Sequence, residues 1–204
     1  MPISKALLLG TVFCGLSACE GGFDLGVSRA APERVQLADG LIVAGADGWC
    51  VDSTTSRRGD DRVVVVLGSC AAIAGTEQAS PDVDGVVTVS VDADDAEPPS
   101  LDALESFFGT EAGRAALARN GQANSIDILD MRESDGILVL HAADESVAPG
   151  IAPDVWRALF DLQGRFVSIS LFGVAAQPIS PDLGRATLAN QVDRLRAANA
   201  NTDL

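Results

Sequence analysis

The sequence has few positive charges and few of the histidine and cysteine side chains that bind zinc or copper. Among its 204 residues, Lys5 is the only lysine and His141 is the only histidine, and 13 arginines are outnumbered by 29 aspartates and glutamates. Binding to nucleic acid requires clustered cations that displace counterions from phosphates, so this composition excludes nucleic acid as a partner. Flat electrostatic binding to an anionic membrane leaflet needs basic segments and is excluded for the same reason.

Several motifs of catalysis and cofactor binding are also missing. No serine stands in a Gly-x-Ser-x-Gly elbow, and the chain contains no Gly-Lys-Ser/Thr or Gly-x-Gly-x-x-Gly phosphate loop and no Cys-x-x-Cys pair. No segment reaches the roughly 20 apolar residues of a membrane-spanning helix. The short apolar run Val63–Leu67 predicts a buried strand instead. We therefore expect no cofactor and no spanning helix.

The N-terminal segment has the organisation of a secretory signal. The basic residue Lys5 precedes an apolar run over 6–18, and small residues stand before a cysteine in Leu16-Ser17-Ala18-Cys19. These four residues resemble the lipobox of bacterial lipoprotein precursors, whereas bulky Phe13 excludes Cys14 from the same role. A buried N-terminal helix or an uncut anchor is the alternative, and the apolar run is too short to span a membrane.

The lipobox resemblance implies the domain organisation and the location of the protein. Residues 1–18 are then a signal peptide, Cys19 is acylated and becomes the mature N-terminus, residues 19–32 form a tether, and residues 33–204 form one domain. The protein would be lipid-anchored in the bacterial cell envelope, with the domain facing the periplasm or the cell exterior. The mature chain loses its only lysine and carries a formal charge of −16, from 13 arginines and 29 acids.

Two cysteines remain for the folded domain, and we expect them to form a disulfide. Extracytoplasmic compartments oxidise thiols, and Cys50 and Cys70 lie at the ends of two predicted strands joined by a polar loop over 52–61. Closing a loop of this size stabilises the fold by about 3 kcal/mol in the chain-entropy model. Two separate buried thiols are the alternative. One histidine and two oxidised cysteines leave no zinc or copper site of the usual composition.

The hydrophobic pattern predicts strands paired in hairpins and two helical segments. Gly109-Thr110 interrupts an amphipathic helix that begins after Ser100, and a second amphipathic helix begins after Ser180 with Pro181 at its first position. Turn dipeptides place hairpins at Asp39-Gly40, Asp135-Gly136 and Gln163-Gly164. We expect an α+β domain with a largely antiparallel sheet of six to eight strands, covered by the 101–119 helical segment and the C-terminal helix.

Asp130 and His141 are the candidate catalytic pair. A two-residue turn at Asp135-Gly136 places Asp130 opposite His141 and Leu129 opposite Ala142, whereas a three-residue turn shifts the register and separates the pair. In a hydrolase-type enzyme His141 would act as the base and Asp130 would orient it. A surface pair is the plainer interpretation, and the sequence supplies no catalytic nucleophile in a recognisable motif.

Three further features are candidates for binding. Arg57-Arg58 is the one local cationic spot and either receives an anionic ligand or pairs with Asp52, Asp60 and Asp61. Trp49 either packs on the disulfide or marks the rim of a binding surface. Acidic clusters at 82–84 and 92–97 could bind calcium, but neither has the spacing of a calcium loop, and solvated loops are the simpler interpretation.

The order of the predicted elements resembles the PsbP-like α-β-α sandwich. The segments 100–119, 125–143, 154–172 and 180–199 carry this resemblance, which is one of layout and not of motif. Members of that family generally bind partners or assist assembly, so the resemblance implies a non-enzymatic, membrane-anchored domain that binds an envelope protein or assists its assembly. A hydrolase that uses Asp130 and His141, or a lipoprotein that binds calcium or a small anion, is the alternative.

Overall fold

The computed structural model describes residues 30–92, 97–146 and 148–200, so Cys19 and the predicted signal peptide lie outside the described residues. The strands are β1 (Arg34–Gln36), β2 (Ile42–Ala44), β3 (Trp49–Arg58), β4 (Arg62–Ser69), β5 (Gly85–Asp92), β6 (Ile126–Ser134), β7 (Ile137–Asp144), β8 (Ile151–Leu162) and β9 (Arg165–Val174). The helices are α1 (Cys70–Ala74), α2 (Leu101–Phe108), α3 (Glu111–Leu117) and α4 (Pro181–Asn199), with a 3₁₀ turn, η1, at Ala123–Ser125.

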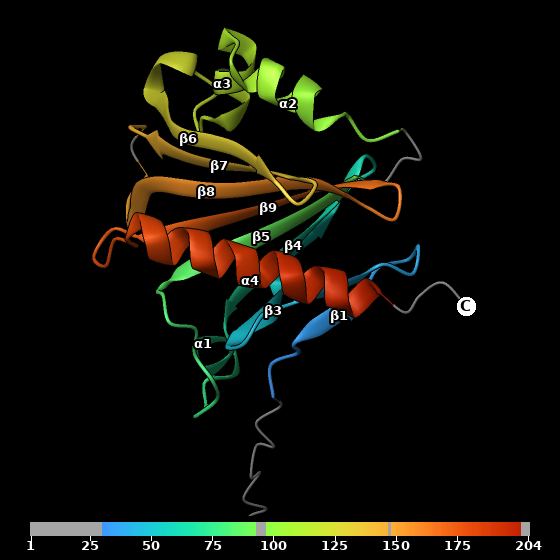
Figure 1. Ribbon diagram of the computed structural model, residues 1–204. Helices are drawn as coiled ribbons and strands as arrows, with labels where there is room; N and C mark the ends of the chain where they lie inside the picture. The colour runs from blue at the N-terminus through green and yellow to red at the C-terminus, as the bar shows by residue number, and fades with distance from the viewer. Residues whose placement is uncertain (1–29, 93–96, 147, 201–204) are drawn as a thin grey trace, which may run out of the picture.

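Seven strands form one sheet in the order β3-β4-β5-β9-β8-β7-β6, and every neighbouring pair is antiparallel (Figure 1). The chain leaves the sheet after β5, forms α2 and α3, and re-enters at the far edge with β6. Three successive antiparallel connections, from β6 through β7 and β8 to β9, then bring β9 beside β5. β1 and β2 form a separate two-stranded hairpin. This architecture confirms the predicted α+β fold with a mostly antiparallel sheet.

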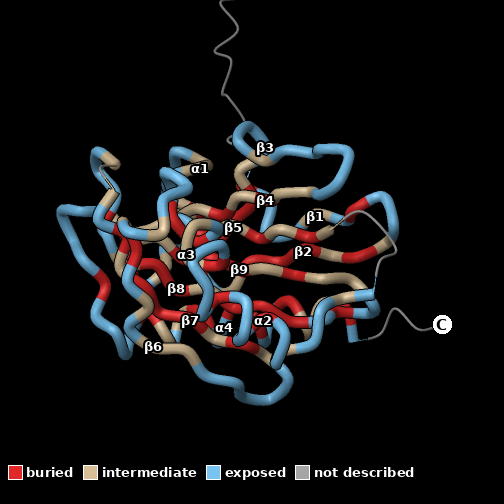
Figure 2. The backbone as a smooth tube through the Cα atoms, turned by 90° about the horizontal axis from the view of Figure 1, so that it is seen from above, coloured by how far each residue is buried: buried red, intermediate tan, exposed pale blue. Residues whose placement is uncertain are grey.

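Helices pack on both faces of the sheet. Successive side chains of a strand point to opposite faces, and apolar side chains lie on both faces here. On one face Leu188, Val192 and Leu195 of α4 join a core cluster with the central strands, which also contains Val43 of the β1–β2 hairpin. On the other face α2 and α3 bury Leu104, Phe108 and Leu117 against β7 and β8. Figure 2 shows the buried residues concentrated along the strands between these layers.

The helix boundaries follow the predicted capping residues. The Ser100 hydroxyl accepts a hydrogen bond from the Ala103 amide at the start of α2, and the Ser180 hydroxyl accepts one from the Leu183 amide at the start of α4. Gly109 separates α2 from α3, as the interruption in the pattern predicts. Thr110, the second residue of this interruption, caps α3 by accepting a hydrogen bond from the Gly113 amide.

Two-residue turns set the registers of both predicted C-terminal hairpins. Asp135 and Gly136 both have positive φ, at 52° and 73°, and so do Gln163 and Gly164, at 56° and 77°. This conformation matches the right-handed twist of the strands, so Ser134 pairs with Ile137 and Phe160 with Val167, as predicted.

Two local predictions are wrong. An irregularity between Ile128 and Asp130 pairs Ile128, not Leu129, with Ala142, and it leaves Leu129 55% exposed. The polar stretch 52–61 is not a loop, because β3 continues to Arg58 before a short turn. Its polarity reflects the solvent-facing edge of the sheet.

Candidate functional site

The only histidine is buried, and its side chain hydrogen-bonds to a different carboxylate from the predicted one. His141 is 6% exposed on β7, and its Nε2 atom lies 2.7 Å from Oδ1 of Asp154 on β8. Its ring stacks on the Trp156 indole with centroids 4.8 Å apart and an interplanar angle of 9°. Asp154, His141 and Trp156 therefore form one cluster on the face of the sheet that α4 covers.

Asp130 lies opposite His141 in the register, as predicted, but the two side chains do not form a pair. The Asp130 carboxylate instead accepts hydrogen bonds from the guanidinium of Arg132, two residues along the same strand. No serine, threonine or cysteine hydrogen-bonds to His141 among the residues that the structure describes. The predicted hydrolase dyad is thus replaced by an aspartate–histidine pair without a nucleophile in contact.

The indole beneath α4 shows how closely this cluster is packed. A Cβ atom added at Gly184 would lie 2.2 Å from Cε2 of Trp156, so only glycine lets the helix approach the ring. The Trp156 Nε1 atom is buried without a hydrogen-bond partner among the described groups. This side of the cluster is therefore closed by the helix backbone and offers no route to a substrate.

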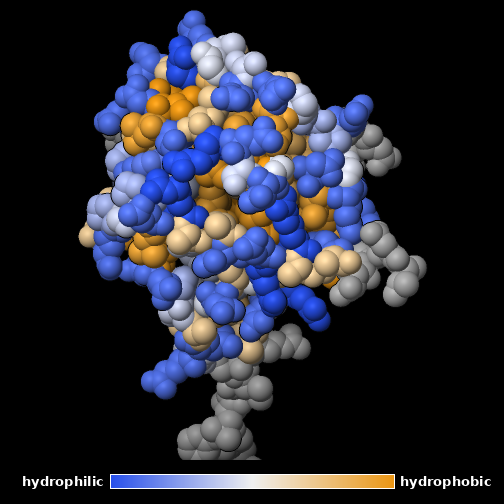
Figure 3. All heavy atoms as spheres, viewed as in Figure 1, coloured by the Kyte–Doolittle hydropathy of each residue, from blue (hydrophilic) through white to orange (hydrophobic). Residues whose placement is uncertain are grey.

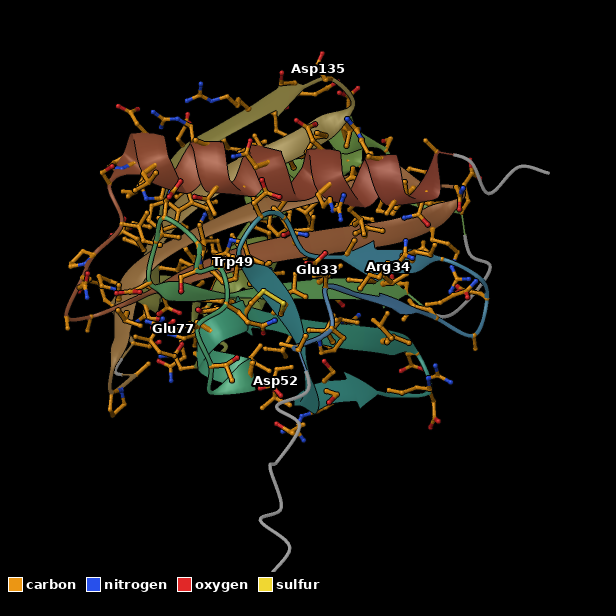
Figure 4. The ribbon with its side chains drawn as sticks, turned by 90° about the horizontal axis from the view of Figure 1, so that it is seen from below. Glu33, Arg34, Trp49, Asp52, Glu77 and Asp135 are labelled. Atoms are coloured by element: carbon orange, nitrogen blue, oxygen red, sulfur yellow. A yellow bond between two sulfur atoms is a disulfide. The ribbon has the colours of Figure 1, made fainter. Side chains whose placement is uncertain are left out.

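Cys50 and Cys70 form the predicted disulfide, with 2.09 Å between the sulfur atoms and 4.8 Å between the Cα atoms. Ala31, Ile73 and Ala74 pack around it as a small separate cluster. Figure 4 shows the disulfide near Trp49 and Asp52 at one end of β3. The bond joins the first turn of α1 to the edge strand β3.

Trp49 belongs to the main core and does not pack on the disulfide cluster. It is 2% exposed, because adjacent residues of a strand point to opposite faces and Cys50 points away from the core. The tryptophan also lines a hollow of about 520 Å³ beside α4, to which Asp47, Asp82 and Asp193 contribute. Hydrophilic side chains cover most of the face of the molecule that carries α4 (Figure 3).

Arg57 and Arg58 are not neutralised as the plainer interpretation expects. Their side chains make no ion pair or hydrogen bond with any residue that the structure describes. Asp52, their expected partner, instead accepts hydrogen bonds from the Thr54 hydroxyl and the Thr54 and Thr55 amides. These bonds hold the pKa of Asp52 below its usual range.

The two arginines line a groove between β1 and the β3–β4 hairpin. The groove encloses about 190 Å³, and its other lining residues are valines, one leucine, one glutamine and two serines: Val35, Gln36, Leu37, Val51, Ser53, Ser56, Val63, Val64 and Val65. No carboxylate lines it. A neighbouring hollow of about 150 Å³ shares Leu37, Arg58 and Val63 with the groove.

A buried ion pair that the sequence analysis missed organises the loop after β7. Asp144 is 2% exposed and accepts hydrogen bonds from the amides of Arg119, at 2.7 Å, and Ser146, at 2.9 Å. The Arg119 guanidinium lies 3.3 Å from the carboxylate and also donates to the carbonyls of Asp144, Ser146 and Ala152. Burial alone raises the pKa of Asp144, but these bonds and the arginine charge together hold it below the usual value.

The acidic clusters do not form a metal site in the described part of the chain. No group of three or more histidine, cysteine, aspartate or glutamate side chains lies close enough there to hold a metal ion. Asp94 and Asp95 lie outside the described residues. Asp92 pairs with Arg62 at 3.7 Å, and its carbonyl accepts hydrogen bonds from Arg165.

None of the described helices is both long enough and apolar enough to cross a membrane. Comparisons with protein-family models, curated proteins and solved structures find no match to this chain. The lipobox and the PsbP-like layout therefore stay predictions, and the function has to be argued from the residues themselves.

Proposed function

We propose that this protein is a bacterial envelope lipoprotein whose domain is held at a membrane by acyl chains on Cys19. The observation that carries the proposal is the sequence Leu16-Ser17-Ala18-Cys19 directly after a short apolar run with Lys5 in front of it. Each buried methylene of an acyl chain contributes about 0.8 kcal/mol, so two or more chains anchor a domain stably.

One structural feature supports this location. The Cys50–Cys70 disulfide fits an oxidising compartment outside the cytoplasm. Eleven positions separate Cys19 from Ala30 in the sequence. At about 3.3–3.6 Å per residue this link spans at most about 40 Å, so the domain would stay close to the bilayer.

The role that we propose for the domain is non-enzymatic, namely binding an envelope protein or assisting its assembly. The environment of His141 disfavours the hydrolase, because its ring contacts Asp154 and Trp156 and makes no hydrogen bond with Asp130 or with a nucleophile among the described residues. Helices on both faces of the sheet are compatible with the PsbP-like layout on which the assembly role rests.

Mass spectrometry of the protein isolated from its native host tests the anchor. We expect a mature chain that begins at Cys19 and carries acyl groups on that residue. A Cys19→Ala variant should remain unprocessed and unacylated, whereas Cys14→Ala should be processed normally. A chain that starts at Met1 with an unmodified Cys19 thiol would contradict the proposal.

Crosslinking in intact cells followed by gentle solubilisation tests the partner role. We expect one crosslinked species of fixed mass with the parent chain. The same species should form with a His141→Gln variant, because the proposed role does not use the imidazole. Recovery of the protein always as a lone species would count against the partner role.

A further inference from the structure

The groove between β1 and the β3–β4 hairpin combines an apolar floor with uncompensated positive charge. Val51 and Val65 in its lining are 3% and 2% exposed and belong to the main core. No carboxylate lines the groove, although the full chain carries a net charge of −15. Asp39, the one carboxylate in the neighbouring hollow, lies 2.6 Å from Arg165 and is neutralised by it.

The register separates the roles of the two arginines. Arg58 pairs with Val63, so its side chain shares the face of the sheet on which Val63 packs against the core. Arg57 pairs with Val64 and so belongs to the opposite face, lining the groove from the edge strand. Of the two arginines, only Arg58 lines both hollows, which makes it the principal cation. The nearest carboxylates in sequence, Asp60 and Asp61, are exposed in the adjoining turn.

We propose that this groove binds the acidic head and the adjoining methylenes of one anionic lipid of the membrane. Arg58 would contact the head, with Arg57 at the edge, and the valine floor would contact the start of the acyl chain. The groove has room for roughly six water volumes, which suits this part of a lipid. A guanidinium binds phosphate through two parallel hydrogen bonds, which adds orientation to charge.

The geometry favours a lipid over an acidic protein. A stable protein interface covers about 800 Å² on each partner, far beyond the extent of the groove. A single head group needs only the local cations. Membrane lipid would also be within reach, because Pro32, thirteen positions after Cys19, accepts a hydrogen bond from the Val51 amide of β3. This last point rests on the proposed anchor at Cys19.

Hydrogen exchange in lipid nanodiscs tests the proposal with the full chain as isolated from its host. Discs of phosphatidylcholine are compared with discs that also contain phosphatidylglycerol. We expect the amides of the 53–64 segment to exchange at least about threefold more slowly in the discs with anionic lipid, because lipid in excess would occupy most of the grooves. Arg58→Gln should abolish this protection, Arg57→Gln should reduce it, and Arg58→Lys should retain part of it. Arg132→Gln on the distant strand β6 is the matched control and should leave it unchanged.

The other outcomes overturn the proposal. Equal exchange in both discs, or protection that survives Arg58→Gln, would show that the groove does not bind anionic lipid. Equal protection by inorganic phosphate would show that the valine floor is not used. Equal protection by a glutamate-rich peptide in phosphatidylcholine discs would indicate an acidic protein instead. Mass spectrometry of Cys19 in the same preparation shows separately whether the anchor is present. If the chain carries no acyl groups, the discs are added in excess, so that lipid binding by the groove is still tested.

Discussion

At the scale of single residues, the most buried charged and titratable side chains have partners that are distant in sequence. Asp144 illustrates this, because both of its oxygens accept backbone amide hydrogens and its charge faces Arg119. Nothing in the sequence near Asp144 indicates an arginine 25 positions earlier. His141 likewise contacts Asp154, although local counting placed Asp130 opposite it.

Replacing Asp144 with asparagine should lower the free energy of unfolding by about 2–3 kcal/mol at pH 7. An amide has only one acceptor oxygen, so either the Arg119 or the Ser146 amide would lose its partner at a partly buried position. Urea denaturation measures the loss. Asp127→Asn, at an exposed position of β6, is the control and should unfold like the parent.

The same variant gives a pH test whose sign follows from the lowered pKa of Asp144. A carboxyl whose pKa is lower in the folded than in the unfolded state contributes stability that is complete above the unfolded value of about 3.9. That contribution disappears as the pH falls through the lower folded pKa. The stability difference between parent and Asp144→Asn should therefore be constant above about pH 5 and shrink below pH 4. A difference that grew on acidification would contradict this explanation.

At the scale of elements, sequence signals succeed where the determinant is local and fail where it is not. The turns at Asp135-Gly136 and Gln163-Gly164 fix the register within each hairpin, so those pairings were predictable. No turn fixes how β5 pairs with β9, because they are far apart in the chain. The irregularity beside Leu129 also has no signature in the sequence. The groove could not be predicted from the sequence for the same reason, because it depends on how β1 lies beside β3.

The edge of β2 shows a set of hydrogen bonds between residues that are far apart in the sequence. Gln191 of α4 is fully buried; its side chain accepts a hydrogen bond from the Ala46 amide and donates one to the Ala44 carbonyl. Asn199 makes the same two kinds of contact with the amide and the carbonyl of Ile42. The helix thereby supplies backbone partners that a further strand would otherwise provide, and it ties the β1–β2 hairpin to the domain.

Gln191→Leu should destabilise the protein by about 3 kcal/mol, because two backbone groups would be left buried without partners. Hydrogen exchange should show the Ala46 amide opening before the central strands do. Asn190→Leu, the same kind of change at the exposed neighbouring position, is the control and should leave this exchange unchanged. Equal effects of the two substitutions would mean that the paired amide is not what holds the hairpin.

At the scale of the whole molecule, the Cys50–Cys70 disulfide closes a 20-residue separation around the β3–β4 hairpin. The double variant Cys50→Ala, Cys70→Ala should lose about 3 kcal/mol, which for a domain of this size corresponds to a fall in Tm of roughly 6–12 °C. The loss of stability should appear as faster hydrogen exchange in β3 and α1, which the bond joins, before it reaches the central strands.

Reductant should lower the Tm of the parent by the same amount and leave the Tm of the double variant unchanged. If reductant also lowered the Tm of the double variant, another cysteine would be responsible. If the double variant matched the oxidised parent, the bond would contribute no stability, and the oxidising compartment would lose its structural support.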